Sequence, residues 1–229
     1  MTPLDRFVAG LRARHGRVPS PDPLDGGASA RLLLLLETPG PALARTDADH
    51  GTVSRDNPTG TGRNLRRFLD GAGIARGDTL IWNAVPWVIH LPGARNRAPK
   101  RAEVRAGLLE LPPLLDLLPR LEAAVLAGRV AGEAGPVLAA SRPSLPVFAM
   151  PHPSPTIVCT SPRVAERIEA ALGEAAGVLR ERSQARRCPG AVRPGTQGHQ
   201  AGQRYPTSRR RSPPSTISPS ATRSPPRRS

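Results

Sequence analysis

Residues 31–41 have the sequence Arg31-Leu-Leu-Leu-Leu-Leu-Glu37-Thr-Pro-Gly-Pro41, and this segment indicates the fold class. Its apolar run is far too short to span a bilayer, and the Thr-Pro-Gly-Pro sequence ends it abruptly. Leucine itself favours helix, but a short continuous apolar run with such a stop is typical of a strand buried on both faces. We therefore predict a buried strand that ends at Glu37.

Three more apolar runs have this character, and segments with helical spacing lie around them. The further strands are predicted over 79–83, 123–128 and 146–150. The helices are predicted over 2–15, 62–71, 101–118 (in two pieces because of Pro112-Pro113), 129–140 and 163–182. Alternating strands and helices predict an α/β fold, a three-layer sandwich with a central, mostly parallel four-stranded sheet and helices on both faces. Ligands bind beyond the carboxyl ends of the strands in such folds.

Charge divides the chain into a body and a tail. The 229 residues carry a formal net charge of +15, and residues 183–229 contain ten arginines and no acidic residue. This Pro/Arg/Ser/Gly-rich segment has too little apolar surface to offset chain entropy. We predict one folded domain over 1–182 and a disordered basic tail over 183–229. A solvated or frame-shifted extension is the favoured interpretation of the tail, and a sequence-independent nucleic-acid tether is the alternative.

Several classes of protein are disfavoured by what the sequence lacks. Two cysteines, Cys159 and Cys188, are too few for a four-cysteine zinc or iron–sulfur site, and we expect neither a metal nor a cofactor. The chain has no G-x-G-x-x-G loop and no Walker lysine, which disfavours a nucleotide-phosphate site. It also has no apolar segment long enough for a membrane span or a signal peptide, so we expect a cytoplasmic protein without a membrane partner.

Polar groups with complementary chemistry follow three of the predicted strands. Glu37 is able to position water, and Asn83 offers both a donor and an acceptor to the edge of a base. His152 is able to donate to a carbonyl oxygen that gains negative charge. Each group also has a structural interpretation: a carboxylate that binds loop amides, an amide that ties two loops together, and part of a stiff connector.

The most specific segment is Pro151-His152-Pro153-Ser154-Pro155. Three prolines in five residues stiffen an extended backbone and remove three N–H donors. Such a loop holds His152 and Ser154 in place at little further entropic cost, and the Ser154 hydroxyl is able to donate to a phosphate. A rigid loop of this kind also suits compression of a DNA backbone during base extrusion.

Taken in order, these segments resemble the uracil-DNA glycosylase superfamily, in its branch without an iron–sulfur cluster. The sequence Leu36-Glu-Thr-Pro-Gly40 is similar to the first motif of the family, and the strand ending in Asn83 is similar to its uracil-recognising segment. The last motif is matched by His152-Pro-Ser-Pro155, and Ser54-Arg-Asp-Asn57 also agrees. The resemblance covers about residues 17–180.

The resemblance implies a monofunctional glycosylase that hydrolyses the N-glycosidic bond of uracil, or of a related deaminated base, after flipping it out of DNA. The implied partner is DNA, the implied protein is a monomer, and no metal or cofactor is required. The implied catalytic residues are Glu37 and His152. The implied base-binding residues are Asn83, Thr38, Pro39 and Gly40, and the implied DNA-backbone contacts are Ser54, Arg55, Pro153 and Ser154.

The chain departs from the family pattern at three places. Leu36 stands where many relatives have glycine, and Thr38 stands where some branches have an Asp or Asn involved with water. The segment His50-Gly-Thr-Val53 contains no Phe or Tyr to stack on the base. No basic, His-bearing insert follows the first motif, so we do not expect a covalent crosslink to DNA. A glycosylase-like protein that binds nucleic acid with weak or no catalysis is the alternative function.

Overall fold

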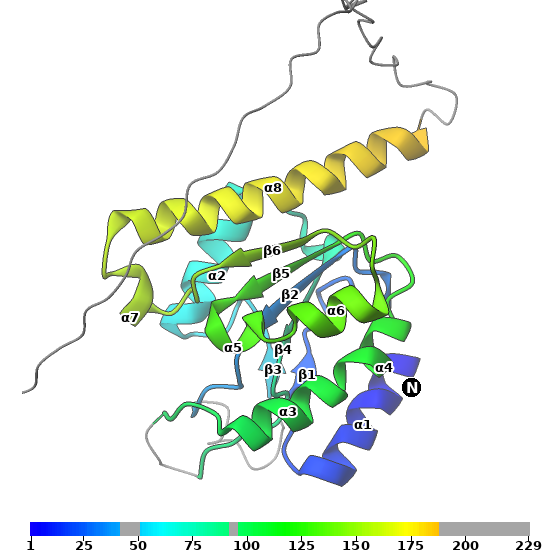
Figure 1. Cartoon of the computed structure of the whole chain (residues 1–229), viewed down its shortest axis with the longest axis vertical. Helices are drawn as coiled ribbons and strands as arrows, with labels where there is room; N and C mark the ends of the chain where they lie inside the picture. Colours follow the sequence, from blue (N-terminus) through cyan, green and yellow to red (C-terminus); the bar gives the residue numbers. More distant parts are fainter. Residues whose placement is uncertain (42–50, 92–95, 188–229) are drawn as a thin grey trace, which may run out of the picture. The chain divides into compact units, whose positions relative to one another are not determined.

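The computed structural model describes residues 1–41, 51–91 and 96–187 (Figure 1). The predictions that concern residues 42–50, residues 92–95 and the tail from Cys188 onward lie outside this part of the chain. The rest of this section concerns the described ranges.

A parallel four-stranded sheet forms the centre of the fold. Its strands lie in the order β4 (Thr79–Asn83), β2 (Leu32–Leu36), β5 (Ala123–Ala127) and β6 (Val147–Met150), and each neighbouring pair is parallel. This confirms the predicted α/β sandwich and all four predicted strands. A separate parallel pair, β1 (Ser20–Pro21) with β3 (Thr52–Val53), was not predicted, because two-residue strands leave no period to detect.

The leucine run explains why both faces of the sheet are covered. Alternate residues of a strand point to opposite faces, so Leu33 and Leu35 enter one apolar cluster while Leu32, Leu34 and Leu36 enter the other. The first face is covered by α1 (Pro3–His15), α3 (Arg101–Leu109), α4 (Leu111–Asp116), α5 (Gly128–Gly132) and α6 (Gly135–Ser141). The second face is covered by α2 (Gly60–Gly71) and α8 (Pro162–Arg187), as Figure 1 shows.

Short elements complete the chain between these layers. They are the 3₁₀ helices η1 (Gly27–Ser29) and η3 (Arg76–Asp78) and the single-turn helix α7 (Pro155–Val158). No described helix has the length and apolar character that a bilayer crossing requires.

The helix predicted over 101–118 does divide in two, but the break lies at Glu110 rather than at the prolines. Pro112 and Pro113 instead occupy the first turn of α4, where a missing N–H costs no intrahelical hydrogen bond. The helix predicted over 129–140 also divides, into α5 and α6.

The last helix continues beyond the predicted boundary at residue 182 and ends at Arg187. The carboxylate of Glu122, which is 3% exposed and directly precedes β5, forms ion pairs with Arg31 and Arg186. In addition, Nη2 of Arg31 donates to the carbonyl oxygen of Leu179 in α8 at 2.5 Å. These contacts attach the end of α8 to the sheet.

Candidate active site

Strand register brings the predicted groups to one edge of the sheet. Leu36 pairs with Asn83, and Ala127 pairs with Met150, so β4, β2, β5 and β6 end at similar heights. In strand order the residues at this carboxyl edge are Asn83, Glu37, Gly128 and His152. The structure therefore brings together the three residues that the sequence singled out and places Gly128 among them.

Gly128 lies between the carboxylate of Glu37 and the side chain of His152. Its φ is +89°, a conformation that favours glycine. A Cβ built on Gly128 would lie 3.0 Å from Cβ of His152 and 3.1 Å from Oε1 of Glu37. Sequence reasoning missed this residue, although a glycine at the end of a predicted strand was a signal that could have found it.

The hydrogen bonding of His152 defines its tautomer. The backbone N–H of Ser154 donates to Nδ1 of His152 at 3.2 Å, so in the neutral ring the proton lies on Nε2. Burial lowers the pKa of His152 below its usual 6.5, and the charge of Glu37 opposes this only in part. At neutral pH the ring is therefore an uncharged hydrogen-bond donor through Nε2.

Helix α2 supports the loop that carries His152. The Nδ2 of Asn64 donates to the carbonyl oxygen of Pro153 at 2.9 Å. Gly60 lies against Pro155 so closely that a Cβ would be 2.2 Å from Cγ of the proline. Pro153 is buried, and the Ser154 and Thr156 hydroxyl oxygens are 3.1 Å apart. The loop is therefore fixed both by its own prolines and by a neighbouring helix.

The segment after β4 lies along the exit of β2. Asn83 is 3% exposed, and the next two backbone N–H groups, of Ala84 and Val85, donate to the carbonyl oxygens of Leu36 and Glu37 at 2.9 and 3.0 Å. These bonds fix Asn83 and Glu37 relative to each other.

The other residues predicted to bind the base, and the two tryptophans, differ in exposure. Thr38 is half-buried, Pro39 is buried and Gly40 is exposed. Trp82 is buried in the apolar core, and Trp87 stacks on His15 with the ring centroids 4.0 Å apart. Both tryptophans thus have packing partners within the protein.

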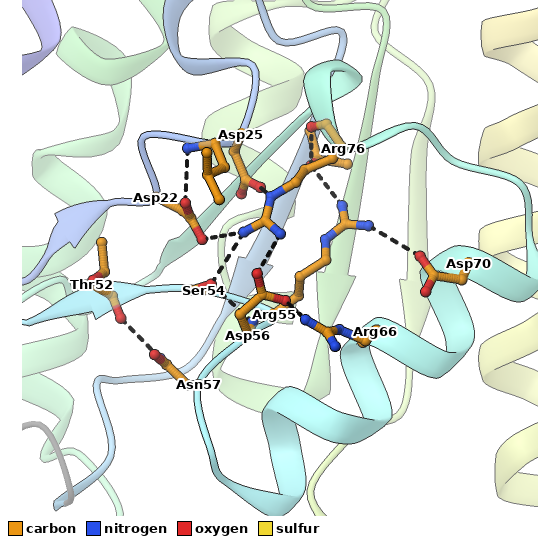
Figure 2. Close-up of polar contacts among 12 residues, drawn as sticks. Asp22, Asp25, Thr52, Ser54, Arg55, Asp56, Asn57, Arg66, Asp70 and Arg76 are labelled. Carbon is orange, nitrogen blue, oxygen red and sulfur yellow. Dashed lines mark hydrogen bonds and ion pairs between the residues drawn. The ribbon is translucent and has the colours of Figure 1, made fainter.

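Ser54 and Arg55 belong to a cluster of charges away from this edge, which Figure 2 shows. Arg55 is 4% exposed, and its Nη2 donates at 2.8 Å to the hydroxyl of Thr79, the first residue of β4. Because Asn83 is the last residue of that strand, the guanidinium lies toward the opposite edge of the sheet. The hydroxyl of Ser54 accepts the N–H of Asp56 at 2.9 Å. The structure thus does not bring the Arg55 head group to the other predicted site residues.

Two further observations concern possible ligand sites. Within the described ranges, His, Cys, Asp and Glu side chains form no group of three or more suited to a metal ion. A cavity of about 250 Å³ lies between α8 and the α2–β4 connection, lined in part by Arg31, Ile74, Asp78 and Leu179. None of the four residues at the carboxyl edge lines it.

Comparison with known proteins adds one match. The model of the "Uracil DNA glycosylase superfamily" matches residues 25–174, a range that includes all four strand ends at the carboxyl edge. No curated protein matches the chain. Since the matched range is well over half of the 229 residues, the chain belongs to the uracil DNA glycosylase superfamily.

Proposed function

We propose that the protein is a monofunctional DNA glycosylase that releases uracil, or a related deaminated base, from DNA. The observation that carries the proposal is the protonation state of His152, a neutral ring with its proton on Nε2. The ring lies beside Glu37 at the carboxyl edge of the sheet, where β4 ends with Asn83. The family match supports the reaction class, and the strand-end chemistry supports the roles of individual residues.

The proposed reaction breaks the bond between C1′ of the sugar and the base nitrogen. The electron pair leaves with the base, whose carbonyl oxygen gains negative charge and accepts the Nε2–H of His152. Glu37 stabilises the positive charge that develops on the sugar, or it orients the water that attacks C1′. Hydroxide from that water adds to C1′, and its proton balances the charge on the departing base. None of these steps needs a metal or a cofactor.

Binding roles follow the positions of the remaining groups. Asn83 hydrogen-bonds the edge of the base with its donor and its acceptor, and Thr38, Pro39 and Gly40 line the base pocket. Pro153 and Ser154 contact the DNA backbone. Ser54 and Arg55 have a structural role: they hold the segment before α2 in place, because the Ser54 hydroxyl binds the N–H of Asp56 and Arg55 binds Thr79.

The test is base release by the full-length protein. Single-stranded or mismatched oligonucleotides containing one uracil are expected to acquire an alkali-labile abasic site, and the same oligonucleotide with thymine should stay intact. A folded sample in large excess that leaves the uracil strand uncleaved after alkali would refute the proposal.

Replacement of Asn83 should slow this reaction. Asn83→Ala removes both hydrogen bonds to the base edge, and we expect single-turnover release to fall at least about tenfold, equivalent to roughly 1.4 kcal/mol. Asn96→Ala, a change of the same kind at an exposed asparagine, serves as the matched control and should keep the wild-type rate. Equal rates for the two variants would remove Asn83 from the site.

Two observations favour a second candidate function, DNA binding without catalysis. Gly51, Thr52 and Val53 provide no aromatic ring to stack on a base, and Thr38 replaces a residue that positions water in some relatives. This alternative predicts DNA binding that weakens with salt, as phosphate contacts do, and no abasic product. The base-release assay distinguishes the two functions.

A further inference from the structure

We infer that Gly128 is a positioning residue, which sets the spacing between Glu37 and His152 and so aligns the carboxylate with the imidazole. The inference rests on the proposed function, since it assigns a task to that same site. It stands on three observations: the place of Gly128 in the strand order, the space around its α carbon, and the stiffness of the loop that faces it.

Strand order is the first observation. β5 lies between β2 and β6 in the sheet, so the residue that follows β5 necessarily separates the residues that follow its two neighbours. Glu37 follows β2, Gly128 follows β5, and His152 comes soon after β6. In this strand order no other described strand lies between the carboxylate and the imidazole. The size of residue 128 therefore determines how far apart the two groups lie.

The limited space around the α carbon of Gly128 is the second observation. The contacts of 3.0 Å to Cβ of His152 and 3.1 Å to Oε1 of Glu37 are tighter than nine in ten Cβ contacts in proteins. Any side chain at position 128 would therefore push one of these groups away. With glycine, the backbone of residue 128 fills the gap without forcing them apart.

The stiffness of the facing loop is the third observation. The contact on His152 is to Cβ, next to a backbone that Pro151 and Pro153 restrict and that Asn64 holds through the carbonyl of Pro153. This loop has little freedom to retreat, whereas the Glu37 carboxylate stands at the end of a side chain that is able to rotate. A methyl group at position 128 should thus increase the separation between the carboxylate and the ring.

Gly128→Ala in the full-length protein tests this. Misplacement by about 1 Å costs up to 10²-fold in rate, so displacement by a few tenths of an ångström should lower single-turnover base release about tenfold. Gly73→Ala is the matched control, because Gly73 also has a positive φ (+67°) but no atom within 4 Å of a built Cβ. Both variants should lose a few degrees of Tm through backbone strain, and only Gly128→Ala should lose rate.

A second measurement does not depend on activity. Glu37→Gln removes the charge that favours the imidazolium, so in the otherwise wild-type protein it should lower the pKa of His152, measured by NMR titration of the ring. The same substitution made in Gly128→Ala should lower that pKa by a measurably smaller amount, because the carboxylate and the ring are further apart and their Coulomb interaction falls with distance. If Gly128→Ala does not fold, Gly128→Asn replaces it, since asparagine adopts positive φ more readily and still carries a Cβ.

The two measurements separate the inference from the proposed function. If the wild-type protein releases no uracil, the proposed function fails, and the pKa measurement still decides the role of Gly128. If uracil is released, but Gly128→Ala matches Gly73→Ala in rate and keeps the full effect of Glu37→Gln on His152, Gly128 is only a turn residue and the inference is wrong.

Discussion

His152→Ala is expected to lower single-turnover base release by about 10² to 10³-fold. Removal of one preorganised donor to a developing oxyanion has a cost of this size in other enzymes. The donor here is fixed in three ways: by the Ser154 N–H on Nδ1, by the prolines on either side, and by the Asn64 amide on the carbonyl of Pro153. Because the ring is already oriented before the reaction, its loss should reduce the rate of the chemical step far more than DNA affinity.

Two comparisons make this result specific. Cys159→Ser, an exposed change at the end of α7, should leave the rate unchanged. The wild-type rate should stay level as the pH falls from 8 to 7, because burial lowers the pKa of His152 below its usual 6.5 and keeps the ring neutral in this range. Below that range protonation of Nδ1 disrupts the hydrogen bond from Ser154, and the rate should decline. A His152→Ala variant with more than a third of the wild-type rate would contradict the assignment.

The parts of the site that were predictable are those that depend on local sequence. An apolar run with a Pro/Gly stop marks a buried strand, and the polar residue after it marks the carboxyl edge of the sheet. Glu37, Asn83 and His152 follow this rule, and parallel pairing brings their positions together once the strands are recognised.

The positioning role of Gly128 could not be predicted from local sequence. Its contacts with Glu37 and His152 depend on β5 lying between β2 and β6, and strand order is a property of the whole sheet. The direction of Arg55 was equally hidden, because the sequence Ser-Arg-Asp-Asn does not tell whether a guanidinium faces DNA or Thr79. The break at Glu110 was missed because proline was treated only as a helix breaker, although the first turn of a helix accepts it.

The second large effect is expected at Asp25, within the charge cluster of Figure 2. Asp25→Asn should increase the free energy of unfolding by about 2 to 3 kcal/mol at pH 7.5, a gain that disappears as the pH approaches 4. The side chain of Asp25 has no exposed surface, and burial raises its pKa from 3.8 to about 6. The gain is to be measured as the difference between wild type and variant in urea unfolding at several pH values.

The sign follows from proton linkage. The folded-state pKa lies above the unfolded value, so the protonated carboxyl group stabilises the fold fully below about pH 3.8, and this stabilisation is lost as the pH rises through about 6. Above that range the wild-type protein keeps a buried charge that asparagine does not have. The two proteins should therefore differ most at high pH and least at low pH.

The nearby Arg55 and Arg76 offset this cost only in part, because their hydrogen bonds go to Thr79, Asp22 and Asp56. Nη2 and Nη1 of Arg76 bind Asp22 and Asp56 at 2.5 Å, whereas Nε lies 3.2 Å from Oδ1 of Asp25 without hydrogen-bond geometry. Both carboxylate oxygens of Asp25 are thus buried without a hydrogen-bond partner among the residues that the structure describes, and the charges of Asp22 and Asp56 repel the ionised group. Asp116→Asn, a change at an exposed aspartate at the end of α4, should alter unfolding little at any pH. A destabilised Asp25→Asn variant at pH 7.5 would show instead that the ionised Asp25 holds Arg55 and Arg76 in place.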